Sequence, residues 1–301
     1  MARRKPATVH GLAVVDKPAG MTSHDVVAVA RKRLGERRIG HSGTLDPDAT
    51  GVLLLGVGEV TRLLRFLTAL GKRYTAEIVL GTSTSTLDAS GEVTGSFDMS
   101  SVTPKQVVAA AARLTGAIEQ IPPMVSAVQI DGVRLHELAR QGIEVERAPR
   151  PVTVHSFDVV PTGGPGIYQC EVHCSSGTYV RTLADDLGRL LGGGAHLRAL
   201  RRTAIGSFGV AEAVGLDDLD HDSLLTPLVA MRDLPRLIVT DEQERMIANG
   251  RRLAVPDALA AESPISADTS SIALATADDR LLAVYERSGG FLVPVVVLPP
   301  R

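Results

Sequence analysis

Hydrophobic and polar residues alternate at residues 74–80, a two-residue period that is typical of a half-buried β-strand. Residues 9–15, 152–160 and 167–174 also have the pattern of strands. Apolar residues spaced three or four positions apart predict helices at residues 23–34, 58–70 and 179–191. Because strands and helices do not alternate regularly, we predict an α+β fold with a mixed, largely antiparallel central sheet and flanking helices.

The expected helix ends carry the residues that usually start and stop helices. We expect Thr22 or Ser23 to cap the first helix and Gly35 to end it. Thr103 with Gln106 three positions later predicts the start of a further helix. Local capping signals therefore support the helical pattern at several points in the chain.

The C-terminal part of the chain has the pattern of a separate, β-rich unit. Short strands are expected at residues 237–239, 272–275, 280–286 and 291–298, around a helix at 240–248. Residues 256–271, rich in Ala, Ser, Pro and Asp, are predicted to form a loop. We place a boundary near residues 230–236, which divides the chain into residues 1–233 and residues 234–301. A unit of this size is marginal unless it packs on its neighbour.

The composition limits the class of protein. Hydrophobic residues make up 44% and charged residues 22% of the 301 residues, which argues against disorder and coiled coils. The apolar runs at residues 52–57 and 291–300 are shorter than the ~20 residues of a membrane span. The apolar stretch after the basic N-terminus is too short for a signal peptide. Two cysteines, Cys170 and Cys174, cannot form a disulfide framework. We therefore expect a cytoplasmic protein without structural zinc.

The charge is close to balanced but unevenly distributed. The net charge is −2, which argues mildly against a nucleic-acid-binding protein. Residues 1–40, however, carry nine Lys or Arg and three Asp or Glu, and a second basic cluster contains Arg198, Arg201 and Arg202. Such basic faces bind phosphates locally, because exposed charges act over roughly 8–10 Å. Ordinary solvated surface charge is the alternative interpretation.

Residues 40–51 (GHSGTLDPDATG) form the most unusual segment of the chain. Its Gly, Asp, Ser and Pro content predicts a loop, and Asp46 before Pro47 predicts a turn within it. Asp46 has two interpretations at this point. It is a turn-capping residue, or it belongs to a pocket in which the backbone closely approaches a ligand.

The motif from His41 to Leu53 resembles the catalytic motif of the tRNA pseudouridine-55 synthases. Further motifs of that family match in order between residues 11 and 206. They begin at Asp16-Lys17-Pro18, Lys72-Arg73-Tyr74, Thr84-x-Thr86-x-Asp88, Pro122-Pro123, Cys174-x-x-Gly177-Thr178-Tyr179-Val180-Arg181 and Gly194-Ala195-His196-Leu197. The number and order of these motifs make the resemblance specific.

The resemblance implies a pseudouridine synthase fold over residues 1–233, with an RNA-gripping thumb at about 120–150, and a small PUA-like RNA-binding domain over residues 234–301. It also implies that the protein isomerises uridine 55 in the T arm of tRNA. This reaction breaks the C1′–N1 bond, turns the uracil and rejoins it through C5. We therefore expect tRNA as the partner, no cofactor, no metal, no membrane association and a monomer.

The resemblance also assigns roles to residues. The expected catalytic residues are Asp46, Arg181 and Tyr74. Asp46 is the catalytic carboxylate and Arg181 its cationic partner, while Tyr74 stacks on the uracil and its hydroxyl is a candidate acid or base. Whether Asp46 attacks C1′, attacks C6 or takes a 2′ proton stays open. The resemblance also implies several substrate-binding residues. His41 fills the stack left by the flipped base or orders the splayed bases, and Leu200 packs on the base. The expected substrate-binding residues are His41, Tyr179, Leu200, Lys17 and Arg202, and further candidate phosphate contacts are Arg37, Arg38 and Arg62.

Three positions depart from the family pattern, and two other functions compete. Gln129, His136 and Arg62 replace residues more usual in the family, which affects the expected grip on RNA and leaves the reacting centre alone. A non-catalytic RNA-binding protein would need the basic faces but not Asp46. A glycosidase would use Asp46 with Asp48 as a carboxylate pair, although carboxylates two positions apart rarely face one bond.

Overall fold

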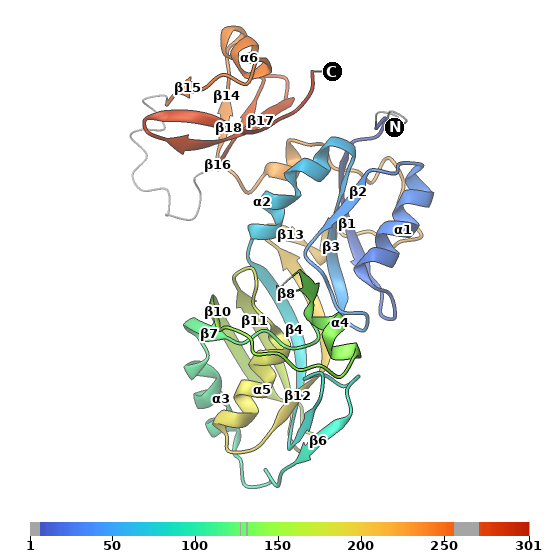
Figure 1. Ribbon diagram of the computed structural model, residues 1–301, viewed down its shortest axis with the longest axis vertical. Coiled ribbons are helices and arrows are strands. Elements are labelled where there is room, and N and C mark those ends of the chain that lie inside the picture. The colour runs from blue at the N-terminus through green and yellow to red at the C-terminus, as the bar shows by residue number, and fades with distance from the viewer. Residues whose placement is uncertain (1–6, 127, 131, 256–270, 301) are drawn as a thin grey trace.

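The structure is a computed structural model that describes residues 7–126, 128–130, 132–255 and 271–300 (Figure 1). A nine-stranded sheet forms its centre. Along its main path the strands are β1 (Gly11–Lys17), β3 (Thr50–Val57), β12 (Ala195–Ile205), β4 (Lys72–Leu80), β11 (Ile167–Cys174), β10 (Arg150–Pro161) and β7 (Gly116–Gln120). Two short strands join at its sides, β2 (Ile39–Ser42) on β3 and β13 (Phe208–Gly209) on β12. Within this sheet only β3 and β12 pair in parallel among the described strands, which confirms the predicted mixed, largely antiparallel sheet.

Helices cover the sheet in separate groups, which are α1 (Ser23–Leu34), α2 (Leu64–Ala69), α3 (Pro104–Arg113) and α5 (Val180–Leu190). Helix α1 buries Val26, Val27 and Ala30 against β1 and β3. Helices α3 and α5 share a second core with β4, β10 and β11 (Figure 1). The apolar faces of these helices thus account for two of the cores that hold the sheet.

Several predicted boundaries are confirmed and two are corrected. Thr22 and Thr103 both form capping boxes, and Gly35 ends α1 in the left-handed conformation with φ 61°. The predicted loop at residues 40–51 is shorter, because residues 40–42 belong to β2 and Thr50 and Gly51 begin β3, and residues 39–42 pair with residues 54–57. The predicted helix at residues 58–70 starts as a 3-10 helix, η1 (Gly58–Leu63), before α2. Short 3-10 segments are common where a helix lacks a side-chain cap, as here.

The segment between β7 and β10 lies in front of α5 in Figure 1. It contains the small hairpin β8 (Gln129–Ile130) and β9 (Val133–Arg134), followed by α4 (Leu135–Arg140). A second small hairpin, β5 (Thr82–Thr84) with β6 (Val93–Ser96), follows β4. Two 3-10 turns, η2 (Val210–Glu212) and η3 (Val229–Met231), lie between β13 and the C-terminal unit.

The C-terminal unit has its own five-stranded sheet, which confirms the predicted small β-rich unit. Its strands, in spatial order, are β14 (Arg236–Ile238), β16 (Ser271–Ala275), β17 (Leu281–Ser288), β18 (Phe291–Val297) and β15 (Leu253–Ala254). Helix α6 (Asp241–Ala248) starts after Thr240, which forms a capping box with Gln243. The predicted loop at 256–271 lies outside the described residues, apart from Ser271, which begins β16.

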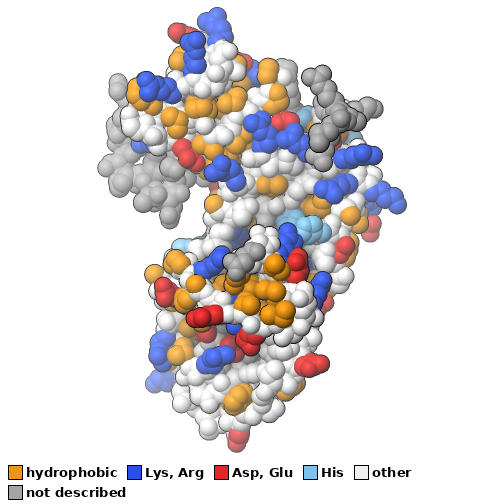
Figure 2. Space-filling view, viewed as in Figure 1, with side chains coloured by type: hydrophobic (Ala, Val, Ile, Leu, Met, Phe, Trp, Pro, Cys, Tyr) orange, Lys and Arg blue, Asp and Glu red, His pale blue; other side chains and the backbone are white. Residues whose placement is uncertain are grey.

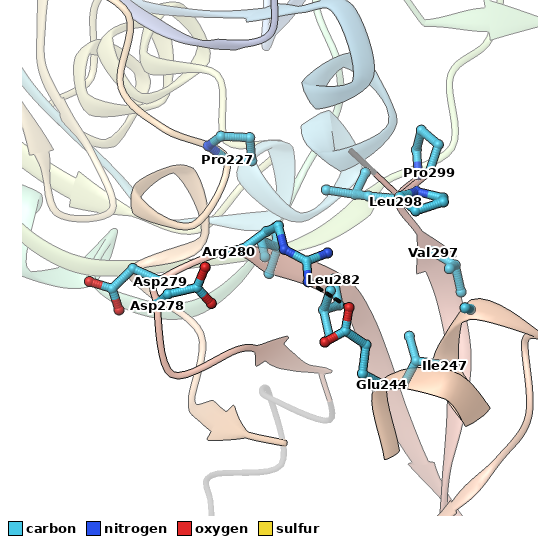
Figure 3. Close-up of a pocket in the computed structure, with 13 residues that line it drawn as sticks. Pro227, Glu244, Ile247, Asp278, Asp279, Arg280, Leu282, Val297, Leu298 and Pro299 are labelled. Atoms are coloured by element: carbon cyan, nitrogen blue, oxygen red, sulfur yellow. Dashed lines mark hydrogen bonds and ion pairs between the residues drawn. The ribbon is translucent and has the colours of Figure 1, made fainter. Parts of the chain in front are cut away.

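The C-terminal unit packs on the rest of the protein through apolar side chains. Ala273, Val284 and Val296 share a core with Phe66 and Leu67 of α2. A cavity of about 300 Å³ lies beside this contact, lined by α6, β17, the chain end and Pro227 (Figure 3). None of the residues expected to act on the substrate lines this cavity.

Candidate active site

Three side chains from other elements hold the loop that carries Asp46. Lys17, at the end of β1, donates hydrogen bonds from Nζ to the carbonyls of Pro18, Met21 and Pro47 at 2.7–2.9 Å. The Ser23 hydroxyl accepts a hydrogen bond from the backbone N–H of Leu45 at 2.9 Å. The position of the loop is therefore set on both sides of Asp46 by buried donors and acceptors.

The third holding residue is Arg202 of β12. Its Nε donates to the carbonyl of Val52 at 2.7 Å and its Nη2 to the carbonyl of Gly43 at 3.2 Å. Gly51 makes this approach possible, since it has φ 102° and a Cβ there would lie 2.1 Å from the carbonyl oxygen of Arg202. Strand β12 thereby reaches the start of the Asp46 loop.

Asp46 and Arg181 meet although they are 135 positions apart in the chain. Arg181 Nε lies 3.0 Å from Asp46 Oδ2, and Arg181 Nη2 lies 3.2 Å from Asp46 Oδ1. This two-point contact is the geometry that a planar guanidinium forms with a carboxylate. The Arg181 side chain is 5% exposed and that of Asp46 is 37% exposed, so the carboxylate is the part of the pair that a substrate can reach.

The remaining donors of Arg181 are also occupied. Its Nη1 donates to the carbonyl of Thr86 at 3.1 Å and its Nη2 to the carbonyl of Val125 at 2.8 Å. The Asp88 carboxylate lies 3.5 Å from Nη1 and accepts hydrogen bonds from the Thr86 and Ser90 hydroxyls. These contacts fix the guanidinium plane toward Asp46.

The environment of Asp46 changes its proton affinity. Burial raises the pKa of Asp46 above its usual value, and the negative charges of Asp88 and Asp48 act in the same direction. The positive charges of Arg181 and Lys17 lower the pKa and oppose this effect. Without the two cations, the carboxylate would be protonated at a still higher pH.

Tyr74 lies beside the Asp46 loop in the core of the main sheet. It shares a core with Leu45 and Ala49 of that loop, and Leu200 packs against the same core. Burial raises the pKa of the Tyr74 phenol, so the hydroxyl stays protonated at neutral pH. This arrangement suits a stacking surface and a hydrogen-bond donor better than a general base.

His41 lies on β2, one residue before the buried Ser42. Its ring meets that of His24 on α1 edge to face, with ring centroids 5.2 Å apart. Burial, His24 and Arg202 all lower the pKa of His41, which favours a neutral imidazole near pH 7. A neutral ring at the entrance to the loop can stack on a base without introducing a charge.

Tyr179 comes directly before α5, which carries Arg181. The Gln120 side chain holds the backbone of Tyr179 at both polar groups. The N–H of Tyr179 donates to Gln120 Oε1 at 2.9 Å, and Gln120 Nε2 donates to the carbonyl of Tyr179 at 3.3 Å. The end of β7 therefore fixes the start of α5.

The expected phosphate contacts divide into three groups. The prediction that Lys17 and Arg202 contact phosphate is wrong, because these side chains are 0% and 1% exposed and their donors bind backbone carbonyls. Arg62 donates to the carbonyl of Val297 at 2.7 Å, and Arg38 pairs with Glu59 at 2.6 Å. Arg37 is exposed and stays a candidate. Charge alone does not distinguish a buried cation from a surface one.

The sequence did not indicate that four further residues shape the site. They are Ser23, Thr86, Asp88 and Gln120. Ser23, Thr86 and Asp88 stand in matched motifs, which is the available signal for them. Gln120 ends an ordinary strand, and no local pattern predicts its contact with Tyr179.

Cationic side chains are common on one face of the molecule. Figure 2 shows Lys and Arg side chains over both the C-terminal unit and the N-terminal elements in the upper half of the view. Across the described ranges, no three His, Cys, Asp or Glu side chains are arranged as metal ligands. No helix among those ranges is long and apolar enough to cross a membrane.

Comparison with solved structures places this fold in one class. A solved Cbf5–Nop10–Gar1 complex contains a chain with a TM-score of 0.73 and 26% identity, over 96% of this chain and 85% of that one. A solved H/ACA RNP bound to a substrate RNA containing 2′-deoxyuridine contains a chain with a TM-score of 0.72 and 24% identity, over 97% of this chain and 86% of that one. The fold, including the PUA-like C-terminal unit, is that of the pseudouridine synthases.

Sequence comparison identifies the family. Residues 31–180 match the N-terminal domain of the TruB family pseudouridylate synthases, and residues 181–240 match the tRNA pseudouridylate synthase B C-terminal domain. The tRNA pseudouridine synthase B of Arthrobacter sp. (strain FB24) is 43% identical over 96% of this chain and 97% of its own length. The tRNA pseudouridine synthase B of Rhodococcus jostii (strain RHA1) is 50% identical over 84% of this chain and 86% of its own length. The chain belongs to the TruB family of pseudouridylate synthases.

Proposed function

We propose that this protein converts uridine 55 in the T arm of tRNA to pseudouridine, with Asp46 as the catalytic carboxylate. The observation that carries the proposal is the two-point contact of Asp46 with the buried Arg181, next to Tyr74. The names of the curated relatives give the same reaction class and the same kind of RNA. The product has the same atoms as the substrate, because the C1′–N1 bond breaks, the C1′–C5 bond forms, and the proton of C5 is replaced by one on N1.

Each residue of the site has a distinct part in this reaction. The Asp46 carboxylate acts on the nucleoside, and Arg181 keeps it ionised and oriented. The neutral Tyr74 ring supports the detached uracil, and Leu200 packs on the same side of the site. Arg181 is held by carbonyls of Thr86 and Val125, so it needs no rearrangement during the reaction.

The uridine must leave its stack before Asp46 reaches it. A flipped base costs a few kcal/mol, and a protein group that fills the gap reduces that cost. We assign this part to His41 and the contact with the flipped nucleotide to Tyr179. Their positions beside the Asp46 loop and at the start of α5 support the assignment.

We propose that residues 1–233 form the catalytic domain, with the thumb at about 120–150, and that residues 234–301 bind RNA as a PUA-like domain. The separate core of β14–β18 supports the division. The carbonyl of Val125, close to the thumb hairpin, accepts a hydrogen bond from Arg181. This bond supports a direct connection between the thumb that grips the RNA and the active site.

Two competing functions predict different results. A glycosidase would need a second carboxylate facing the same bond, but Asp48 is exposed and both oxygens of Asp46 contact Arg181. An RNA-binding protein without turnover would not need the Asp46 charge. The Asp46–Arg181 pair therefore favours the synthase.

Replacement of Asp46 tests the proposal directly. We expect Asp46→Asn to lower the rate of pseudouridine formation in a T-arm minihelix by on the order of 10⁴-fold, because the amide keeps the shape and loses the charge. The measurement is mass-spectrometric mapping of the RNA, with the dissociation constant of the minihelix measured in parallel.

Asp48→Asn is the matched control, since it removes an exposed carboxylate two positions away. We expect its rate to stay within about twofold of the unsubstituted protein. Release of free uracil by the unsubstituted protein, lost equally in both variants, would favour the carboxylate pair of a glycosidase. An unsubstituted protein that binds the minihelix and forms no pseudouridine would leave only the RNA-binding function.

A further inference from the structure

The central sheet consists of two halves that meet at a short seam. Strands β1, β2 and β3 form one half, and β4, β7, β10, β11 and β12 form the other (Figure 1). Within the halves the ladders are long, with seven paired residues between β1 and β3 and nine between β4 and β12. At the seam, β3 and β12 pair only through Thr50 with Arg201 and Gly51 with Arg202.

The catalytic pair spans this seam. Asp46 lies in the loop between β2 and β3, on one half, and Arg181 lies on α5, which packs on β12 of the other half. A shift of one half against the other therefore changes the distance between Asp46 and Arg181. Displacements near 1 Å are enough to lower a catalytic rate by up to about 10²-fold.

An ion pair closes the seam on the face opposite the active site. Arg201 Nη1 lies 3.0 Å from Asp16 Oδ1, and Arg201 Nη2 lies 2.7 Å from Asp16 Oδ2. Nη1 also lies 3.4 Å from the hydroxyl of Thr50. Since side chains alternate along strands, Asp16 and Arg201 point away from the Asp46 loop, which their neighbours Lys17 and Arg202 hold.

We propose that the Asp16–Arg201 ion pair positions Asp46 opposite Arg181 by joining the two halves of the sheet. Asp16 and Arg201 are positioning residues, because neither contacts Asp46 or Arg181. Their two-point contact resists both sliding and rotation at the seam, which a single hydrogen bond would not. The proposal rests on the proposed function, because it concerns the rate of that reaction.

Asp16→Asn tests the proposal with little change in shape. We expect the single-turnover rate of pseudouridine formation to fall about tenfold, and the KM for the minihelix to stay within twofold. The charges that face Asp46 are Arg181 from α5, Lys17 from β1, Asp88 and Asp48. In the variant, Arg181 is held less closely to Asp46 and lowers the pKa of Asp46 less than in the unsubstituted protein. The pH below which the rate falls is therefore expected to be higher.

Glu77→Gln is the matched control. Glu77 of β4 pairs with Arg198 of β12 at 3.0 Å, with similar exposure, but these two strands already share a nine-residue ladder. We expect Glu77→Gln to leave both the rate and the pH profile unchanged. The charge-swapped double variant Asp16→Arg with Arg201→Asp restores the pair in reverse, and we expect its rate to return to within about threefold.

The outcomes separate the inference from the function on which it rests. An unsubstituted protein without activity overturns the proposed function. With that protein active, an Asp16→Asn rate and pH profile equal to those of Glu77→Gln overturn the positioning role. A rise in KM without a fall in rate also overturns it, since Arg201 would then contact RNA. If Asp16→Asn does not fold, a folded but slow double variant overturns the proposal and a folded, active one supports it.

Discussion

The charged side chains around Asp46 and those of the C-terminal unit differ in depth. The whole residues Lys17, Arg181 and Arg202 are at most 4% exposed, and their partners come from segments up to 159 positions away. In the C-terminal unit, Arg280 pairs with Glu244, and the two side chains are 36% and 33% exposed. Arg236 pairs there with Asp279, whose side chain is 73% exposed.

This difference shows which charges contribute most to the stability of the fold. A buried cation keeps its donors satisfied, and breaking its contacts leaves unpaired groups that cost several kcal/mol. An exposed pair competes with water and contributes about 0–1 kcal/mol. The loop of Asp46 is therefore held by its charges, whereas the C-terminal unit is held by its apolar core around Tyr285 and Leu274.

Among changes to the cations of the site, Arg181→Lys should have the largest effect on the rate, because Arg181 is the cation that contacts the Asp46 carboxylate. A lysine offers one point charge in place of the two-point fork, and it leaves the carbonyls of Thr86 and Val125 with fewer donors. We expect the single-turnover rate to fall by about 10³-fold, equivalent to about 4 kcal/mol. The pKa of Asp46 should also rise, so that activity is lost at a higher pH on acidification.

Arg189→Lys is a suitable control for this prediction. Arg189 lies two turns further along α5 and pairs with Asp185 at 2.8 Å, and its side chain is 72% exposed. We expect a rate within about twofold of the unsubstituted protein. A loss in Arg181→Lys no larger than in Arg189→Lys would show that depth does not matter here.

Lys17→Met should reduce stability rather than remove a phosphate contact. Three carbonyls lose a charged donor, and this loss outweighs the benefit of no longer burying the charge. We expect the free energy of unfolding in urea at pH 7 to fall by about 3 kcal/mol. Lys32→Met, on the exposed side of α1, should change it by less than about 0.5 kcal/mol. Equal values for the two variants, with weaker RNA binding by Lys17→Met, would support a phosphate contact.

The sequence predicts local features of this fold better than it predicts depth. Capping residues act within one turn, so Thr22 and Gly35 could be identified from the chain alone. The pairing of Asp46 with Arg181 followed from matched motifs, and no local pattern implies it. Lys17 and Arg202 were expected at the surface because their burial depends on strands and loops that are distant in the chain. Burial depends on the whole fold, so it cannot be predicted from the identity of a single cationic residue in the sequence.

Lys72 provides a pH test of the buried cations. Its Nζ donates to the carbonyls of Thr68 and Leu70 at the end of α2, and burial lowers the pKa of Lys72 to about 8. Between that value and its usual 10.5, the folded protein has lost this proton and the unfolded chain keeps it. The contribution of Lys72 to stability therefore rises with pH in this range, by about 2 kcal/mol from pH 8 to 9.5.

The measurement is the difference in unfolding free energy between the unsubstituted protein and Lys72→Met at each pH. The comparison with Lys72→Met is needed because the two cysteines, which both proteins share, change the unfolding free energy with pH in the opposite direction. Burial raises the pKa of Cys170 to about 12 and that of Cys174 to about 11, so their contribution falls as the unfolded thiols ionise. A difference that stays flat from pH 8 to 9.5 would mean that Lys72 keeps its proton in the fold.

The smallest expected effect is at Arg280 in the C-terminal unit. Arg280 Nη2 lies 2.5 Å from Glu244 Oε1 of α6, and this ion pair is at the edge of the cavity beside Pro227 (Figure 3). Because water and salt compete for both side chains, we expect Arg280→Gln to lower the free energy of unfolding by less than about 1 kcal/mol. The loss should shrink further at 1 M salt, where charges are screened beyond about 3 Å. A loss as large as that of Lys17→Met, unchanged by salt, would mean that the C-terminal unit also depends on its charges, and the contrast with the Asp46 loop would fail.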